Sequence, residues 1–446
     1  MKKYFLCFLG CLAAIGMASA QSTRPVHWVH GLNGSSTTWN FHKSYFESAR
    51  RIDGPASYNS TGLTNLGVVS YSNAVRSAMI PNANAIAIGH SMGGVTVRDI
   101  ARYDAINSTT TFGGFIAAGA PLTGAKILNS ISNGSAENFI LNGVDEIVRG
   151  PATALGLYNF FVAGEPVISS VLLIKSIRKG ILKFFLGSFD FPLNDTHAGS
   201  AFGVQTFDDL KENSAYMNAV NTFSGPYKDR LFIYGNESSP IHWRLASSTL
   251  KSGSGASWTS TDDEYLVNLA SNFRSVYNTQ NTLNITAAIL AYSTFNFGVG
   301  AGHTYMASQW RKGRDWLDMS ESYWAGLIGA HGTTYYAGMI DTYEDQCDMP
   351  RFEECFGNGD DPVTVDCEDC TVVPVTYAVW IPTQTGSDGL VAVYSQLAEG
   401  TPWAVSSGRT YQAVNVNHME MRGHTHMTTE LSHCFDRLDF FSTPLW

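Results

Sequence analysis

The sequence predicts an α/β protein with a mostly parallel sheet that helices cover on both faces. The strongest observation is an apolar run, Ala85–Ile88, that leads through "GHSMGG" directly into a helical pattern ending near Ala105. A second is the apolar start of "PVHWVHGLNGSSTTW" (25–39), which ends at His30-Gly31, and a third is the apolar stretch "FGGFIAAGAP" (112–121). Strands that alternate with helices in this way are typical of a parallel sheet.

The bulk composition allows a large core and excludes one class of partner. The chain has 446 residues, of which 44% are hydrophobic and only 15% are charged. This length permits one large domain or one domain with large insertions. The formal net charge is −10 and no basic run is longer than "RKG", so we expect no nucleic-acid partner.

The N-terminal segment "MKKYFLCFLGCLAAIGMASA" is typical of a secretory signal peptide, with two lysines, an apolar core and small residues before Gln21. We expect cleavage after Ala20 and a secreted or periplasmic protein. Cys11 follows "FLG" as in a lipoprotein site, but the apolar run before it is very short. No later stretch is apolar and long enough to span a bilayer.

Local periodicity predicts the remaining elements. After the first strand we expect helices at 40–51 and 66–79. Further along the chain, the predicted elements are an amphipathic helix at 207–221, strands at 229–236, 376–382 and 413–426, and a closing helix at about 427–441.

These elements divide the chain into a core and two insertions. The core comprises 21–122, 223–239 and 376–446, behind the signal peptide at 1–20. A helical lid or cap insertion occupies 123–222, and it contains the highly apolar tract 166–189. A second insertion with its own small fold occupies 240–375 and ends in a cysteine-rich acidic loop.

Cys7 and Cys11 belong to the signal peptide, so the mature chain keeps five cysteines. They are Cys347, Cys355, Cys367, Cys370 and Cys434. Because the first four lie close together in an exported chain, we expect two local disulfides and a free Cys434. A zinc site is the alternative, since Cys367 and Cys370 form C-x-x-C. Structural calcium is a second possibility at "EECFGNGDDP", although a solvated acidic loop explains the same residues.

Ser91 is the candidate nucleophile because it lies in G-x-S-x-G between a predicted strand and a predicted helix. Gly89 and Gly93 have no Cβ, so strand and helix can approach across a tight turn around a strained serine. The hydroxyl group would then lie at the mouth of the sheet, beside the positive end of the helix.

A serine nucleophile needs a base and a group that orients the base. For the acid we choose Asp388 in "GSDGLV", just past the predicted strand 376–382, over Asp361 and Asp436. For the base we choose His418, directly behind the last predicted strand. The alternative bases are His424, His426 and His433, and the "HTH" pair is also a weak candidate for a metal site.

The oxyanion needs two N–H donors. One should be the backbone N–H of Met92, which follows the nucleophile, and the other that of Leu32 in the "HGLNG" loop. His30 would then brace this loop rather than act as a base. The chain order Ser91, Asp388, His418 is the order of the α/β-hydrolases.

Together, "VHGLNG", "GHSMGG", "GAPLTGA", "SDGLV" and "VNHMEMR" resemble the α/β-hydrolase superfamily, and within it the secreted lipases and inositol-deacylase-like serine esterases. The resemblance covers about 25–235 and 376–440, and "DLKENSAYMNAVN" is similar to a lid-flanking helix of such lipases. It implies an α/β-hydrolase fold with a helical lid region and a large late insertion. It also implies a serine carboxyl-ester hydrolase that needs no cofactor.

Two other functions fit the same residues. A secreted acyltransferase or amidase would use the same Ser91, Asp388 and His418, while a catalytically dead hydrolase-like binding protein is less favoured because all three positions are occupied. The expected partner is a small-molecule or lipid ester. The tract 166–189 has apolar residues at helical spacing and lysines four apart, which predicts a basic amphipathic lid helix at a lipid surface or, alternatively, a core helix.

Overall fold

The structure is a computed structural model that describes residues 23–32, 34–54, 58, 66–136, 138–139, 143, 204–237, 241–250, 264–346 and 371–446. The predicted signal peptide, the apolar tract 166–189 and the four clustered cysteines lie outside these residues. The chain forms two compact units: one runs to Ala330 and resumes with Gly386–Trp446, and the other is His331–Thr385.

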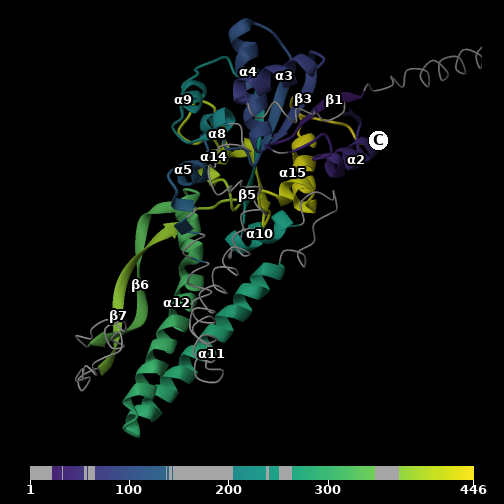
Figure 1. Cartoon of the computed structure of the whole chain (residues 1–446). Coiled ribbons are helices and arrows are strands. Elements are labelled where there is room, and N and C mark those ends of the chain that lie inside the picture. Colours follow the sequence, from purple (N-terminus) through teal and green to yellow (C-terminus); the bar gives the residue numbers. More distant parts are fainter. Residues whose placement is uncertain are drawn as a thin grey trace, which may run out of the picture. The chain divides into compact units, whose positions relative to one another are not determined.

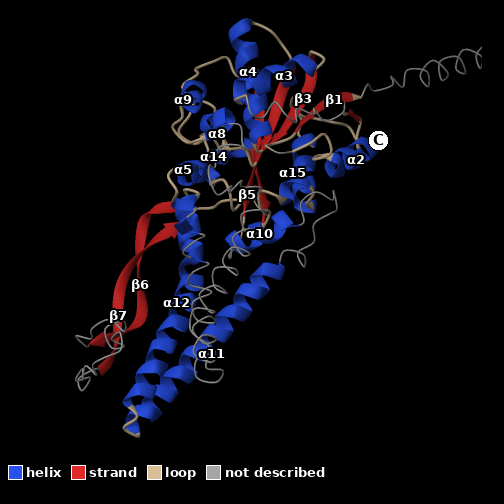
Figure 2. Ribbon diagram, in the orientation of Figure 1, coloured by secondary structure: helices blue, strands red, loops and turns tan. Residues whose placement is uncertain are grey.

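The first unit contains the predicted parallel sheet. Its six strands are β1 (Arg24–Val29), β2 (Ile52–Asp53), β3 (Asn82–His90), β4 (Phe112–Ala118), β5 (Asp229–Asn236) and β8 (Thr410–Val414). They lie in the order β2-β1-β3-β4-β5-β8 and every neighbouring pair is parallel. Figures 1 and 2 label β1, β3 and β5 of this sheet. Since parallel strands need crossover connections, the chain between them forms helices.

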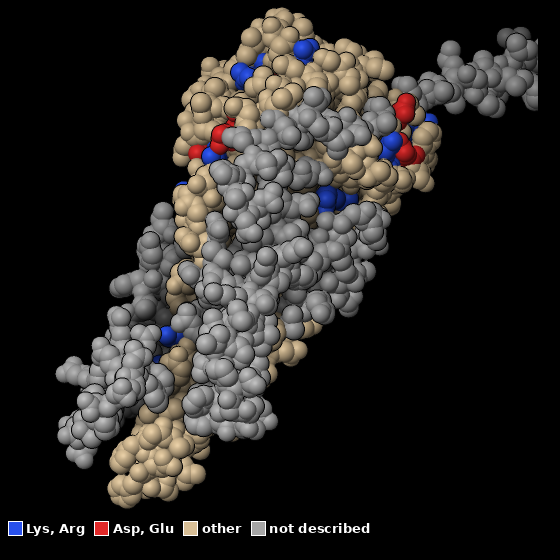
Figure 3. Space-filling view, viewed as in Figure 1, with Lys and Arg blue, Asp and Glu red and all other residues tan. Residues whose placement is uncertain are grey.

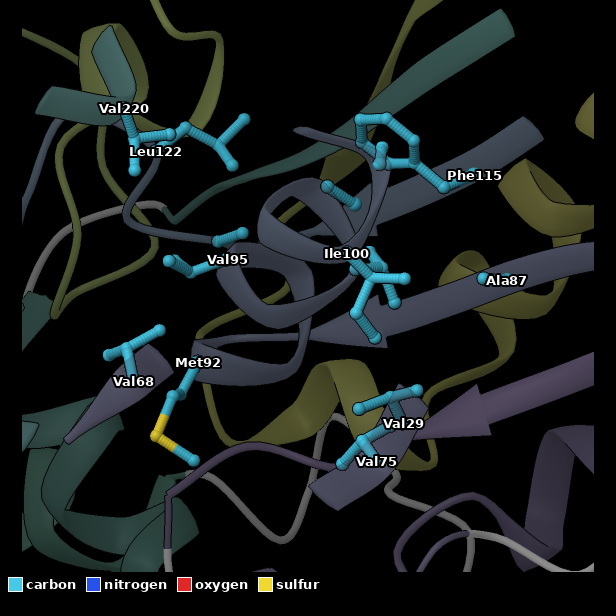
Figure 4. Close-up of a cluster of buried hydrophobic side chains, with 14 of the residues drawn as sticks. Val29, Val68, Val75, Ala87, Met92, Val95, Ile100, Phe115, Leu122 and Val220 are labelled. Atoms are coloured by element: carbon cyan, nitrogen blue, oxygen red, sulfur yellow. The ribbon is translucent and has the colours of Figure 1, made fainter. Parts of the chain in front are cut away.

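Helices cover both faces of this sheet. They include α2 (Asn40–Ala49), α3 (Val68–Ala78), α4 (Met92–Asn107), α8 (Val204–Leu210), α9 (Ala215–Asn221), α14 (Val393–Gln396) and α15 (Thr425–Phe435). The short helix α5 (Lys126–Ser132) instead contributes Ile127 to a separate buried cluster. On one face, Ala87 and Phe115 of the strands pack with residues of α3 and α4 (Figure 4). On the other face, Ile86 and Ile116 pack with residues of α2 and α15. Neighbouring residues of one strand face opposite sides of the sheet because the side chains of a strand repeat every two residues.

Three further helices lie between β5 and the end of this unit's first segment. They are α10 (Ile241–Leu250), α11 (Glu264–Ser293) and α12 (Phe297–Leu327). α11 and α12 are long and run antiparallel, side by side (Figures 1 and 2). None of the helices in the described parts of the chain has the length and apolar character required to cross a membrane.

The second unit is an antiparallel pair of strands, β6 (His331–Gln346) and β7 (Thr371–Gln384). Residues 376–382 therefore form a strand, but our assignment of this strand to the core sheet is wrong, because β7 pairs with β6. The physical reason is the length of the pairing, which runs from His331↔Gln384 to Gln346↔Thr371. A local antiparallel partner also costs less loop-closure entropy than a place in a distant sheet.

Two other predicted elements have different bounds. The amphipathic stretch 207–221 is two helices, α8 and α9, because Asn213 has φ 60° and the Ser214 hydroxyl accepts the Met217 N–H as a helix cap. The last strand ends at Val414 rather than continuing to 426, because Asn415 has φ 55° and turns the chain. The closing helix is Thr425–Phe435.

Candidate active site

Ser91 occupies the turn between the end of β3 and the start of α4. Its φ of 55° and ψ of −127° are strained values for a residue with a side chain. The turn is fixed by hydrogen bonds from Ser91 N to Ala118 O (3.0 Å) and from Gly94 N to Ser91 O (2.9 Å). A Cβ on Gly89 would lie 2.2 Å from Gly93 O, so this close approach of strand and helix requires glycine.

The structure brings the three predicted side chains together in one hydrogen-bonded chain. His418 Nε2 lies 2.9 Å from Ser91 Oγ, and His418 Nδ1 lies 2.8 Å from Asp388 Oδ2. Asp388 is fully buried, His418 is almost fully buried, and Ser91 is partly exposed. With Nδ1 donating to the carboxylate, Nε2 is the nitrogen that can accept the proton of the serine hydroxyl.

The carboxylate of Asp388 is held by backbone donors. Oδ1 accepts hydrogen bonds from Leu390 N (3.0 Å) and Val391 N (2.7 Å). These bonds fix the carboxylate, which leaves Oδ2 to face His418. The backbone carbonyl of Asp388 also accepts the backbone N–H of His418 at 2.8 Å. Two hydrogen bonds therefore connect Asp388 and His418.

Asp388 lies at the carboxyl end of β5. It also follows the strand 376–382 in the chain, as predicted, but that strand is part of β7 and does not belong to the core sheet. The backbone of Glu237, just past β5, donates to Ser387 O at 2.7 Å, and a Cβ on Gly235 would lie 2.7 Å from Asp388 Cβ. β5 and Asp388 are therefore neighbours in space, although the residues between 237 and 386 separate them in the chain. Trp324 of α12 supports the same loop, since its indole N–H donates to Gly389 O at 2.8 Å.

His90 is a residue of the site that the sequence did not indicate. Its Nε2 donates to the backbone carbonyl of His418 at 2.9 Å, and the two ring centroids are 4.8 Å apart. Burial, followed by the nearby charges of His418 and Arg422, lowers the pKa of His90 well below its usual value. A neutral His90 therefore supports the His418 backbone without competing for the proton.

A buried polar cluster includes Asn417, the residue directly before His418. Asn417 Oδ1 accepts the N–H groups of Met419 and Glu420, and Glu420 Oε2 accepts the Asn417 N–H at 3.0 Å. Ser248 Oγ of α10 lies 3.0 Å from Glu420 Oε1 and 2.7 Å from Asn417 Nδ2.

Arg244, also in α10, brings a positive charge to this cluster. It lies 2.6 Å from Glu237 Oε1 and 3.9 Å from Glu420 Oε1, and both carboxylates are fully buried. The helix α10 is therefore tied to both the end of β5 and the segment that carries His418. This connection could not be predicted from the sequence, because Arg244 lies in a segment without a recognised motif.

The loop after β1 approaches the nucleophile closely. A Cβ on Gly31 would lie 2.7 Å from Ser91 Cβ, so glycine is required for this contact. His30 is fully buried and its Nδ1 donates to Gly31 O at 2.8 Å, while the Tyr71 hydroxyl donates to His30 O at 3.3 Å. Leu32 follows Gly31 directly, and Met92 is the first residue of α4, where an N–H has no acceptor within the helix.

The alternative bases make other contacts. His424 Nδ1 accepts the His426 N–H and caps α15, and His426 Nδ1 donates to Val414 O at 2.9 Å. His433 pairs with Glu430 on the surface. Of the alternative acids, Asp436 pairs with Arg50 at 2.6 Å, whereas Asp361 lies outside the described residues.

Across the described ranges, no group of three or more histidine, cysteine or carboxylate side chains is arranged to hold a metal ion. The predicted disulfides, the alternative zinc site and the acidic loop considered for calcium lie outside those ranges. Cys434 is a buried free thiol, as predicted, and burial raises its pKa well above the usual value.

Fold and site together define a parallel α/β protein that holds a buried aspartate, a histidine and a strained serine in one hydrogen-bonded chain. Compared with the known protein families and with curated protein sequences, the chain matches none of them.

Proposed function

We propose that this protein is a serine hydrolase of the α/β-hydrolase type that cleaves carboxylic esters through an acyl-enzyme, as lipases and esterases do. The observation that carries the proposal is the chain of hydrogen bonds from Asp388 through His418 to Ser91. Supporting it, the serine lies in a strained turn at the carboxyl end of β3, where parallel α/β sheets present their reactive groups.

In the first half-reaction, His418 Nε2 takes the proton of Ser91 as Oγ attacks the ester carbonyl carbon. The tetrahedral intermediate collapses when the imidazolium returns this proton to the leaving alkoxide, and the acyl group stays on Ser91. Asp388 keeps His418 Nδ1 protonated and stabilises the imidazolium. This role is supported by the position of its carboxylate, which two backbone N–H groups hold and which lies 2.8 Å from Nδ1.

The developing oxyanion needs donors beside Ser91, and we assign this role to the N–H groups of Met92 and Leu32. Met92 supports the assignment because it starts α4, and Leu32 because it follows Gly31, which contacts Ser91. In the second half-reaction His418 removes a proton from water, whose oxygen attacks the acyl carbon. The imidazolium then returns this proton to Ser91 Oγ as the bond between Ser91 and the acyl group breaks and the acid is released. This chemistry requires no cofactor.

Labelling with a fluorophosphonate probe tests the proposal. The wild-type protein and Ser77→Ala, an exposed-serine control on α3, should be labelled, and both should hydrolyse p-nitrophenyl esters. Ser91→Ala should show no labelling and lose several orders of magnitude in ester turnover while remaining folded. Labelling that persists in Ser91→Ala, or an unlabelled and inactive wild type, would refute the proposal.

Export is part of the same proposal, with the signal peptide removed after Ala20. N-terminal sequencing of the protein recovered outside the cytoplasm should begin at Gln21. Recovery of an intact N-terminus would contradict it.

A further inference from the structure

Near the turn that connects them, α11 and α12 have small residues on the inside, whereas farther along the pair the rings of Tyr277 and Trp310 are buried 5.1 Å apart. Ala288 and Ala291 of α11 are buried, as are Gly300 and Ala307 of α12. A Cβ on Gly300 would lie 2.6 Å from the ring of Tyr292, so the two helices approach more closely than larger side chains would permit. Such packing is typical of helix pairs that associate where water does not supply the driving force.

The large apolar residues at the end of the pair point outward. We call them the tip surface; it consists of Ile289, Leu290, Phe295, Phe297 and Val299, all of which are exposed. Phe295, in the turn between the helices, is 81% exposed. Water-soluble helix pairs ordinarily have the opposite arrangement, with large apolar residues inside and polar residues outside.

The same end of the pair carries no charge. Residues 275–310 contain no Asp, Glu, Lys or Arg, and Figure 3 shows neither colour at this end of the view. Counted from the tip, the first charged residues are Arg274 on α11, which pairs with Asp318 at 2.6 Å, and the basic Arg311 and Lys312 on α12. An uncharged tip with basic residues behind it complements an apolar layer bordered by anionic groups.

Polar side chains near the tip find partners within the pair. The hydroxyl groups of Thr282, Thr286 and Thr304 each donate to the backbone carbonyl four residues earlier. His303 Nδ1 lies 2.9 Å from Asn284 Oδ1, across the two helices. Groups that are satisfied in this way do not have to keep their contact with water, which lowers the cost of entering an apolar medium.

We propose that the tip surface inserts into the apolar layer of a lipid surface and so attaches the protein to it. We commit to lipid rather than a second protein chain because the tip is uncharged, its polar groups are satisfied internally, and the nearest charges are basic. The attachment is interfacial, since neither helix is apolar enough to span a bilayer. It does not depend on the proposed hydrolase activity.

Flotation with phospholipid vesicles, neutral and with one-third anionic phosphatidylglycerol, tests this proposal. The full chain should float with both, and more strongly with the anionic vesicles. Phe295→Ser/Phe297→Ser should bind about a hundredfold more weakly, because each phenylalanine lost from the apolar layer reduces partition about tenfold. The matched control Ile80→Ser, at a site 79% exposed and distant in sequence, should bind as the wild type does.

Sedimentation distinguishes lipid binding from self-association of the chain, and ester hydrolysis tests the proposed active site separately. Both variants should unfold at the wild-type temperature and hydrolyse soluble short-chain esters at the wild-type rate, because they alter exposed residues outside the site. No flotation of the wild type, or equal flotation of the double variant, overturns the proposal. A wild-type dimer that the double variant dissociates, without vesicle binding, would make the tip an interface between copies of this chain. An inactive protein that still floats would refute only the hydrolase.

Discussion

At the scale of single residues, the site depends on how closely the loop after β1 approaches the nucleophile. Gly31→Ala places a methyl group 2.7 Å from Ser91 Cβ, so either the loop or the serine must move. Because a displacement of about 1 Å costs roughly a hundredfold in rate, we expect kcat for a soluble ester to fall by about that factor. Steady-state kinetics measure the effect.

Gly408→Ala is the control for this prediction, because a Cβ at Gly408 has nothing within 4 Å. Its kcat and unfolding temperature should equal those of the wild type. An unchanged kcat in Gly31→Ala would show that the loop yields without disturbing the serine.

The base can be tested with two histidines that lie close together in the sequence. His418→Ala should lower ester turnover by about 10⁴-fold or more, since no other group then accepts the serine proton. His424→Ala removes the cap of α15 and should cost about 1 kcal/mol of stability, but it should keep most of the activity. The reverse result, with His424 essential and His418 dispensable, would reassign the base.

Local sequence patterns predicted several residues of the candidate site. Ser91 and Met92 follow from G-x-S-x-G in its strand and helix context, and His418 from its place behind the last strand. Asp388 was identified for a partly wrong reason, since the strand that positions it is β5. His90 and Glu420 were not found, because a supporting contact to a backbone or a buried carboxylate leaves no local pattern in the sequence.

At the scale of elements, α10 is held to the site by a buried ion pair. Arg244→Met would remove the positive charge that lies 2.6 Å from the buried Glu237 and 3.9 Å from the buried Glu420. Removing one partner of a buried pair typically costs about 3–5 kcal/mol, and we expect a loss of that size in the free energy of unfolding. Chemical denaturation measures it, and Glu237→Gln/Arg244→Met should recover part of the loss.

The exposed pair of Arg274 and Asp318 provides the comparison. These side chains are 58% and 34% exposed, so Arg274→Met should change the free energy of unfolding by less than about 1 kcal/mol. Similar effects of the two arginine substitutions would mean that the α10 ion pair does not stabilise the fold.

The elements themselves were predictable where the periodicity is local. The apolar strands β1, β3, β4 and β5 and the helix α4 follow from their spacing of apolar residues. β7 was predicted as a strand, but its partner was not, because an apolar run does not say which strand lies beside it. α11 and α12 bury small or amide side chains near their connecting turn and expose large apolar ones there, which gives no ordinary amphipathic pattern, so these helices were not anticipated.

At the scale of the whole molecule, His42 joins elements from both ends of the chain. It lies in α2, its Nε2 donates to Met421 O at 3.0 Å, and its Nδ1 lies 3.0 Å from the Thr428 hydroxyl of α15. The side chain is fully buried. Burial, more than any other cause, lowers the pKa of His42 from 6.5 to about 4. The folded protein therefore holds this histidine neutral.

This lowered pKa predicts a loss of stability in acid. As the pH falls from about 6.5 to about 4, the unfolded chain binds the proton at His42 before the folded protein does, so the equilibrium shifts toward unfolding. Between pH 7 and pH 5 this one residue should lower the free energy of unfolding by about 2 kcal/mol.

Urea denaturation at the two pH values tests this expectation. The drop in the free energy of unfolding should be smaller by that amount in His42→Gln than in the wild type. The control Thr429→Gln, at an exposed position of α15 without a titratable group, should keep the wild-type drop. Equal drops in all three proteins would show that His42 is not held neutral and that the contact between α2 and α15 tolerates its charge.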